Sequence, residues 1–299
     1  MLKRAITGLF ILLTVVGFIV LKQFSNLFFD ALIMLIMYCS LYETIKVYKI
    51  DNKSIDYSVY LTPAIMCVIF NLEQDTFKAI GYVILMSILF VLYLLSCEIV
   101  AYAIKRKNGT AETDPEVLNK TLFDKTKYTL LVYIYPVCVL SLLLALNHIE
   151  YTLSYMGLIF AFACSMMTDT FAYLFGRTFG KRKFIPEVSP NKTVAGLVGG
   201  FVGGILSAVI CILCFAYFEP LKTTVALNKD MFILVFSALG ILGALADTLG
   251  DLVASALKRK VGVKDYGHIF PGHGGFMDRV DGLMFTIAII YIAFALFLL

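Results

Sequence analysis

Residues 79–104 read AIGYVILMSILFVLYLLSCEIVAYAI, an apolar block that contains a single charged residue, Glu98. The block is longer than the roughly 20 apolar residues that an α-helix needs to cross the hydrocarbon core of a bilayer. Eight further apolar blocks occupy residues 5–21, 28–48, 57–71, 129–147, 152–175, 194–217, 231–256 and 281–299. The sequence therefore predicts an all-α integral membrane protein, a polytopic bundle of about nine transmembrane helices.

The overall composition supports this fold class. Hydrophobic residues make up 60% of the 299 residues, charged residues make up 15%, and the mean hydropathy is +0.88. Soluble domains contain roughly 45–50% apolar residues, so a soluble fold could not hide this apolar surface. All seven cysteines lie inside the apolar blocks, and we expect them to be small buried hydrophobic residues rather than a disulfide framework.

The distribution of positive charge predicts the orientation of the helices. With the amino terminus in the cytoplasm, 21 of the 25 Lys and Arg residues fall in inside loops, which leaves only Lys22, Lys78, Lys222 and Lys229 outside. We therefore expect a multi-pass protein of the cytoplasmic membrane whose amino terminus and active site face the cytoplasm. We also expect transmembrane helices and a cytoplasmic connector over residues 1–127, followed by a catalytic transmembrane region over residues 128–299.

The first group of polar residues begins inside the sixth apolar block. Asp169, Tyr173 and Arg177 are spaced by four residues and so share one face of a helix. A carboxylate at membrane depth is costly and usually faces a cavity or a partner, which favours a functional role over a structural Asp–Arg pair. The Gly-, Lys- and Arg-rich segment that follows is typical of a phosphate-binding loop, although the positive-inside bias also places basic residues there. Its candidate ligands are Ser189, Lys192 and Thr193.

The second group lies at the end of the eighth block. Asp247, Asp251 and Ser255 also repeat every four residues, and the two carboxylates would repel each other unless a cation lies between them. A magnesium ion meets that need, and so does a proton- or sodium-coupled site of a transporter. The charged, Gly-rich loop that follows favours phosphoryl-type chemistry. Its His-Gly-Gly turn, residues 273–275, allows the backbone to approach a ligand, and Asp278 and Arg279 place a metal-type ligand beside a phosphate-type ligand.

These residues carry a family resemblance. The run Ser255-Ala-Leu-Lys-Arg-x4-Lys-Asp-x-Gly-x2-Phe-Pro-x-His-Gly-Gly-Phe-x-Asp-Arg-Val-Asp281 resembles the phosphatidate cytidylyltransferase signature. The upstream segment is similar to the family's Asp-x-x-Ala-Tyr-x-x-Gly-Arg-x-x-Gly-Lys stretch and its Ser-Pro-x-Lys-Thr turn, and nine spans fit the family's architecture. One position departs from the pattern, because Ala195 stands where the family usually has a glutamate.

The resemblance implies transfer of a cytidylyl group from CTP to phosphatidic acid with Mg²⁺ as cofactor. It implies metal binding by Asp251 and Asp278, to which the four-residue spacing adds Asp247. The expected catalytic residues are Asp251, Asp278, Lys258, Arg259, Asp265 and Arg279. The expected substrate-binding residues are Asp169, Tyr173, Arg177, Ser189, Lys192, Thr193, Ser255, Lys264, His273, Gly274, Gly275 and Asp281.

The expected partners are CTP, phosphatidic acid and membrane lipid, without nucleic acid, and the sequence allows a homodimer. Two alternatives remain from the residues alone: another CTP-dependent membrane lipid enzyme, such as a polyprenol- or phytol-type kinase, and a secondary transporter. The repeated glycines of the seventh block form G-x-x-x-G faces that predict close helix packing rather than nucleotide binding. They are Gly196, Gly199, Gly200, Gly203 and Gly204.

Overall fold

The computed structural model describes residues 2–48, 53–107, 127–217, 229–270 and 274–297. The first four helices are α1 (Leu2–Leu21), α2 (Asn26–Tyr48), α3 (Lys53–Leu72) and α4 (Thr76–Lys107). The next pass, Lys127–His148, includes the π-helical turn η1 (Tyr133–Cys138) and α6 (Val139–His148). It is followed by α7 (Tyr151–Phe179), α8 (Val194–Ile212), the π-helical turn η2 (Leu213–Tyr217), α9 (Lys229–Lys260) and α10 (Met277–Phe297).

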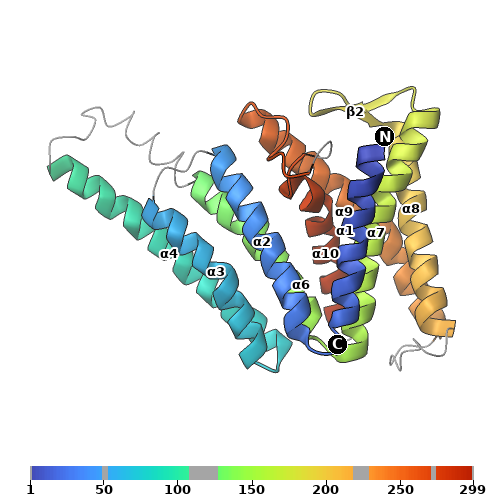
Figure 1. The fold of residues 1–299 in the computed structure, drawn as a ribbon, viewed down its shortest axis with the longest axis horizontal. Coiled ribbons are helices and arrows are strands. Elements are labelled where there is room, and N and C mark those ends of the chain that lie inside the picture. The colour runs from blue at the N-terminus through green and yellow to red at the C-terminus, as the bar shows by residue number, and fades with distance from the viewer. Residues whose placement is uncertain (1, 49–52, 108–126, 218–228, 271–273, 298–299) are drawn as a thin grey trace.

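The helices cover all nine predicted apolar blocks, which confirms the fold class. Seven of them are long and apolar enough to cross a membrane within the described residues. Among the described residues, α1 and α3 contain shorter apolar stretches, Thr7–Leu21 and Ser58–Leu72. The bundle spreads like a fan in Figure 1, with α3 and α4 at one edge and α8 at the other. Helix α10 lies in the middle and packs against α6, α7 and α9.

The polar connections gather at one end of the bundle. The amino terminus, the hairpin between α7 and α8, and the carboxyl end of α9 lie at the top of Figure 1, whereas the carboxyl terminus lies at the bottom. This arrangement is the one that an odd number of helical passes produces. The two groups of polar residues found in the sequence are therefore at the same end of the molecule.

Small residues bring α7, α8 and α9 close together, as the sequence predicted. A Cβ atom added at Gly203 would meet the backbone of Met167 on α7, and one added at Gly204 would meet the carbonyl oxygen of Gly240 on α9. Only glycine allows backbones to approach this closely. The packing role of the α8 glycines is confirmed, and this packing sets the separation of the helix ends that carry the polar residues.

The structure differs from the sequence prediction at the helix ends. Helix α10 begins at Met277, four residues before the predicted block, so Asp278 and Arg279 lie on its first turn and not in a loop. Helix α9 continues to Lys260. Apolar periodicity detects the lipid-matched part of a helix and misses its polar ends.

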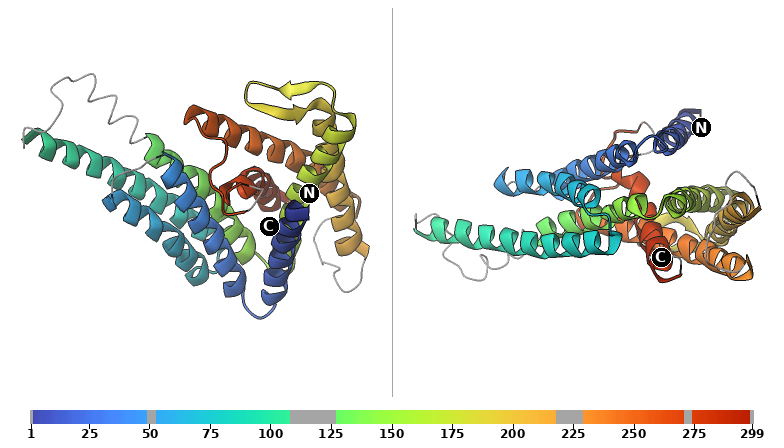
Figure 2. Two further views of the ribbon diagram at one scale, coloured as in Figure 1. Left: turned by 45° about the horizontal axis from the view of Figure 1, so that its top comes forward. Right: turned by 90° about the horizontal axis from the view of Figure 1, so that it is seen from below.

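The connection between α7 and α8 also departs from an all-α fold. It contains an antiparallel hairpin of β1 (Lys183–Ile185) and β2 (Ser189–Thr193). In this hairpin Lys183 pairs with Thr193, and Ile185 pairs with Ser189. The hairpin holds the predicted phosphate-binding segment over the end of the bundle (Figures 1 and 2).

Candidate functional site

A polar cavity of about 580 Å³ lies between the ends of α7, α8 and α9, strand β2 and the first turn of α10. It brings together the two groups of polar residues that the sequence identified separately. The predicted residues in its lining are Asp169, Tyr173, Arg177, Ser189, Lys192, Thr193, Asp247, Asp251 and Arg279. The four-residue spacing of Asp169, Tyr173 and Arg177 therefore does place these three side chains on one cavity-facing side of α7.

Lys192 and Asp251 form an ion pair across the cavity. The Nζ atom of Lys192 lies 2.8 Å from Oδ2 of Asp251 and donates a hydrogen bond of 3.2 Å to the carbonyl oxygen of Thr248. The other carboxylate oxygen of Asp251 accepts a hydrogen bond from Ser255 at 3.3 Å. Both charged side chains remain partly exposed, at 23% for Lys192 and 34% for Asp251. This pair links β2 to α9 at a position that an incoming anion can reach.

Two further carboxylates share the cavity. Asp247 is almost fully buried, and its Oδ1 accepts a hydrogen bond from Ser165 at 2.5 Å. Asp169 is exposed to the cavity that it lines, where the Asp251 carboxylate repels its charge and Arg279 and Lys192 attract it. The cavity thus presents acidic and basic groups side by side in a largely apolar protein.

Thr193 has a structural role in this wall. Its hydroxyl accepts a hydrogen bond of 3.0 Å from the backbone N–H of Gly196, so it is the N-cap of α8. An added Cβ atom at Gly180 would collide with this hydroxyl. The turn therefore packs closely against Thr193, which directly follows Lys192 in strand β2.

Asp278 occupies a different position, behind the polar cavity. Its Oδ1 accepts a hydrogen bond of 2.6 Å from Nζ of Lys258, and its Oδ2 accepts hydrogen bonds from the backbone N–H groups of Tyr266 at 2.8 Å and Gly275 at 2.9 Å. Asp281 lies 4.0 Å from the same lysine, whose ammonium group also lies 5.4 Å from the centre of the Tyr266 ring. Asp278 therefore fastens the loop between α9 and α10 to both helices.

This loop is tightly built around the buried carboxylate. Gly274 has a φ of +79°, which favours glycine, and an added Cβ atom there would lie 3.0 Å from the Asp278 carboxylate. Tyr266 is buried in the same cluster, and burial raises the pKa of its hydroxyl far above the usual range, so the hydroxyl stays neutral.

Glu43 of α2 is a site residue that the sequence analysis missed. It is 2% exposed, and its two carboxylate oxygens accept hydrogen bonds from the backbone N–H groups of Phe276 at 2.9 Å and Met277 at 2.8 Å. Gly267 and Gly275 leave room for it, because an added Cβ atom at either position would collide with the Glu43 carboxylate. A carboxylate here accepts hydrogen bonds from N–H groups at the start of α10 that have no partner within the helix. Its negative charge also interacts favourably with the positive end of the helix dipole.

The remaining predicted residues lie away from the cavity lining. Ser255 is buried behind Asp251, and Lys264 is exposed. The exposed Arg259 donates from Nη1 to the carbonyl oxygen of Val263 at 3.2 Å, and Asp265 lies close to Gly274. His273 falls outside the described residues. Phosphate contacts by these side chains stay predictions.

Two of the predicted magnesium ligands, Asp247 and Asp251, line the cavity together, whereas Asp278 does not, and magnesium binding by these residues stays a prediction. Asp278 does not line the cavity, because its oxygens are used by Lys258 and by two backbone N–H groups. Among the described residues, no group of three or more His, Cys, Asp or Glu side chains is placed to hold a metal ion. Magnesium often needs only one or two carboxylates together with substrate phosphates. Asp251 and Asp169, which both face the cavity, fit that smaller requirement.

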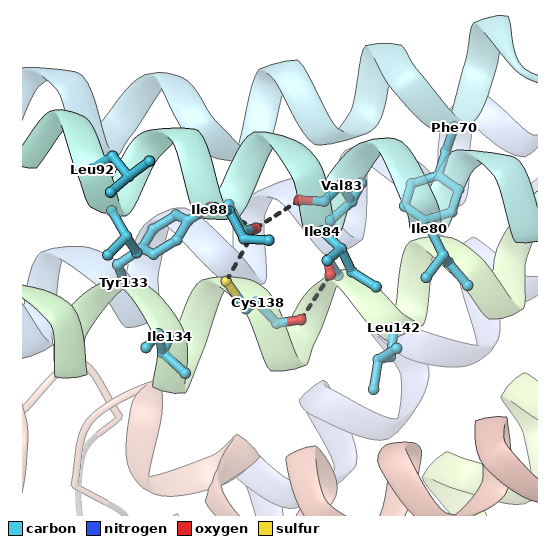
Figure 3. A pocket seen from close by; sticks show the side chains of 13 residues that line it. Phe70, Ile80, Val83, Ile84, Ile88, Leu92, Tyr133, Ile134, Cys138 and Leu142 are labelled. Carbon is cyan, nitrogen blue, oxygen red and sulfur yellow. Dashed lines mark hydrogen bonds between the residues drawn. The ribbon is translucent and has the colours of Figure 1, made fainter.

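A separate apolar cavity of about 430 Å³ lies between α3, α4 and the Lys127–His148 pass (Figure 3). Its polar atoms are already used: the Tyr133 hydroxyl donates to Oγ of Ser87 at 2.9 Å, and Ser87 donates to the carbonyl oxygen of Val83 at 2.7 Å. None of the predicted site residues lines it. It is therefore not part of the candidate site.

Comparisons with known proteins point to one family. The sequence profile of the cytidylyltransferase family matches residues 2–297. Phosphatidate cytidylyltransferases of Staphylococcus haemolyticus (strain JCSC1435) and Staphylococcus aureus (strain COL) are each 42% identical to the chain over 135 residues. That of Staphylococcus saprophyticus is 41% identical over the same length. In each comparison the similarity covers 45% of this chain and 47% of the relative, so it spans about half the length of the curated relatives.

Proposed function

Because the chain belongs to the cytidylyltransferase family, we propose that it transfers a cytidylyl group from CTP to phosphatidic acid and forms CDP-diacylglycerol and pyrophosphate. The observation that carries this proposal is the polar cavity, in which Arg177, Lys192 and Arg279 face carboxylates at one end of a membrane-embedded bundle. A nucleotide and a lipid phosphate can meet there while the acyl chains remain in an apolar environment.

The reaction joins two anions. A phosphate oxygen of the lipid attacks the α-phosphorus of CTP, the bond from that phosphorus to the oxygen bridging to the β-phosphate breaks, and pyrophosphate leaves with the electron pair. Neutralising and aligning the two reactants is therefore the main task of the protein. The three cationic side chains in the cavity supply positive charge, and no covalent enzyme intermediate is needed.

Lys192 and Asp251 have complementary roles in the proposal. Lys192 binds a nucleotide phosphate as a point charge on the hairpin, which is positioned by the α8 cap. Asp251, with Asp169, would hold a magnesium ion that supplies further positive charge for the triphosphate. Ser255 keeps the Asp251 carboxylate oriented through their hydrogen bond.

The proposal includes the location and the assembly state. The end of the bundle that carries the cavity also carries most of the Lys and Arg residues, which supports a cytoplasmic-facing active site in the cytoplasmic membrane. A homodimer stays a prediction, and the mass of the detergent-solubilised protein tests it.

Purified protein supplied with CTP labelled in the cytidine and with phosphatidic acid tests the activity. The proposal requires lipid-linked cytidine and an equal amount of pyrophosphate. Release of CDP without labelled lipid would identify a CTP-dependent kinase, and absence of turnover with any lipid phosphate would refute the proposal. Asp251→Asn is the control for activity that belongs to this cavity and not to a contaminant.

A further inference from the structure

Helix α10 begins without a capping side chain of its own. Phe276 directly precedes the first helical residue, Met277, and its side chain has no hydrogen-bond acceptor. Ser, Thr, Asp or Asn commonly stands at this position and accepts a hydrogen bond from a backbone N–H group of the first helical turn. The N–H groups at the start of α10 therefore need an acceptor from elsewhere in the protein.

Glu43 of α2 supplies that acceptor from a position more than 200 residues earlier in the chain. Its Oε1 accepts the hydrogen bond of the Phe276 N–H group and its Oε2 that of the Met277 N–H group, so both oxygens are used. The loop between α9 and α10 closes around this carboxylate, since Gly267 and Gly275 have no side chain that would displace it. The cap of α10 is thus provided by a different helix.

The turn that Glu43 caps carries a residue of the polar cavity. The backbone N–H of Arg279 donates to the carbonyl oxygen of Phe276 at 2.9 Å, which closes the first turn of α10. The Arg279 side chain lines the cavity, where it attracts the Asp169 carboxylate. Because the direction of a helical side chain follows that of its backbone, the place of this guanidinium depends on the turn that Glu43 holds.

We propose, on the basis of the function proposed above, that Glu43 is a positioning residue for cytidylyl transfer, which caps α10 from α2 and thereby fixes the Arg279 guanidinium at the polar cavity. Glu43 does not line the cavity itself, so it acts through Arg279 and not on a reactant. A shift of about 1 Å in a reacting group can cost about a hundredfold in rate, even when the residue replaced lies far from the chemistry.

Glu43→Gln tests the role, because glutamine keeps the size of the side chain but offers one acceptor oxygen in place of two. CDP-lipid formation is measured at a temperature below the thermal midpoints of the variant and of wild type. We expect kcat to fall about tenfold or more. The KM for CTP should stay within about twofold, because Arg177 and Lys192 lie on α7 and β2, away from the capped turn.

Asp30→Asn is the matched control on the same helix. Asp30 is a buried carboxylate near the beginning of α2, which lies at the bottom of Figure 1, and it is about 20 Å from Glu43 along the helix. It accepts hydrogen bonds from the side-chain amides of Asn71 and Asn147, each at 2.8 Å. Its replacement also leaves a buried amide in place of a hydrogen-bonded carboxylate. It should lower the thermal midpoint while kcat of the folded protein stays near wild type.

A double-mutant cycle with Arg279→Lys separates positioning from stability. Lysine keeps the positive charge on a flexible stem, so it depends less on the exact direction of the turn. In this background the loss of kcat caused by Glu43→Gln should shrink to about threefold or less, whereas a loss that only reflects less folded protein would be the same in both backgrounds. Equal losses in the two backgrounds, or a wild-type kcat in Glu43→Gln, would overturn the proposal. Gly267→Ala, whose methyl group displaces the same carboxylate, replaces Glu43→Gln in this comparison if that variant does not fold.

Hydrogen exchange keeps this result separate from the activity assay, because it needs neither CTP nor turnover. The backbone N–H groups of residues 276–279 should exchange faster in Glu43→Gln than in wild type or in Asp30→Asn. Absence of CDP-lipid formation by the wild-type protein would refute the proposed function. Unchanged exchange at residues 276–279 in Glu43→Gln would overturn the positioning role, whatever the activity assay shows.

Discussion

Asp278→Asn should destabilise the protein strongly and Asp251→Asn should not, although the sequence suggested the same metal-binding role for both acids. Asp278 and its partner Lys258 are 4% and 9% exposed, with 2.6 Å between Nζ and Oδ1. Asparagine keeps the size of the side chain but removes the charge. The Lys258 ammonium is then left buried, with Asp281 at 4.0 Å as its nearest remaining carboxylate.

The expected magnitudes follow from this burial. Removing one partner of a buried ion pair costs about 3–5 kcal/mol, which lowers the thermal midpoint on the order of 10 °C. The Lys192–Asp251 pair is partly exposed, and such pairs contribute about 0–1 kcal/mol. Asp251→Asn should therefore keep a midpoint close to wild type, while CDP-lipid formation falls by orders of magnitude because a magnesium ligand is lost.

The assay pairs thermal unfolding of the detergent-solubilised variants with CDP-lipid formation measured against magnesium concentration. A Lys258→Met/Asp278→Asn double variant serves as the control, because it removes the unpaired charge and should recover part of the stability lost in Asp278→Asn. A stable Asp278→Asn protein with an altered magnesium dependence would refute this reasoning and support the metal-ligand role predicted from sequence. Strong destabilisation by Asp251→Asn would refute it as well.

Other substitutions test the rest of the arrangement. Glu43→Gln should cost about 1–3 kcal/mol, because a neutral amide no longer accepts both N–H groups equally well, and amide hydrogen exchange at residues 276–277 should accelerate; unchanged exchange would contradict the contact. Lys192→Ala should raise the KM for CTP about tenfold without lowering the thermal midpoint, and normal kinetics would remove it from the site. Gly204→Val should lower the midpoint strongly because of the Gly240 carbonyl, whereas Gly81→Val, which has open space around it, should not. In a background without native cysteines, Asn191→Cys should react only with thiol reagents applied from the cytoplasmic side, and labelling from outside would reverse the topology.

Much of the fold follows from local sequence patterns. The length of apolar blocks identifies the membrane helices, and the glycine spacing of α8 identifies its contacts, because Gly203 and Gly204 each lie against a neighbouring backbone. The same patterns miss the first turn of α10, since Asp278 and Arg279 interrupt apolar periodicity without interrupting the helix. The repeat of about 3.6 residues per helical turn holds for polar residues as well as apolar ones. It therefore predicted correctly that Asp169, Tyr173 and Arg177 lie on one face of α7.

The site is predicted less completely, because proximity along the chain does not decide which charges pair. Asp278 was grouped with Asp251 by the family resemblance, whereas the need for a cation between acids concerned Asp247 and Asp251. Lys258, one turn beyond Ser255 on α9, is the cation that pairs with Asp278, and Asp278 does not line the cavity. Lys192 from the hairpin is the cation that pairs with Asp251. Asp278 thus pairs with Lys258 outside the cavity lining, whereas Asp247 and Asp251 both line the cavity, and shared metal binding stays a prediction.

Glu43 shows that an amino-terminal helix contacts the segment that carries the family signature. Its position inside an apolar block was a usable signal, since an intramembrane acid usually has a partner, but the partner is more than 200 residues away in the chain. Helix α2 contacts the start of α10 through Glu43 and also supplies Leu35 to an apolar cavity of about 220 Å³ that Arg279 lines as well. Because Arg279 lies on that first turn of α10, helix α2 contacts both the turn that carries the guanidinium and the wall of this cavity. One amino-terminal helix therefore contacts both a cavity wall and the segment that carries the family signature.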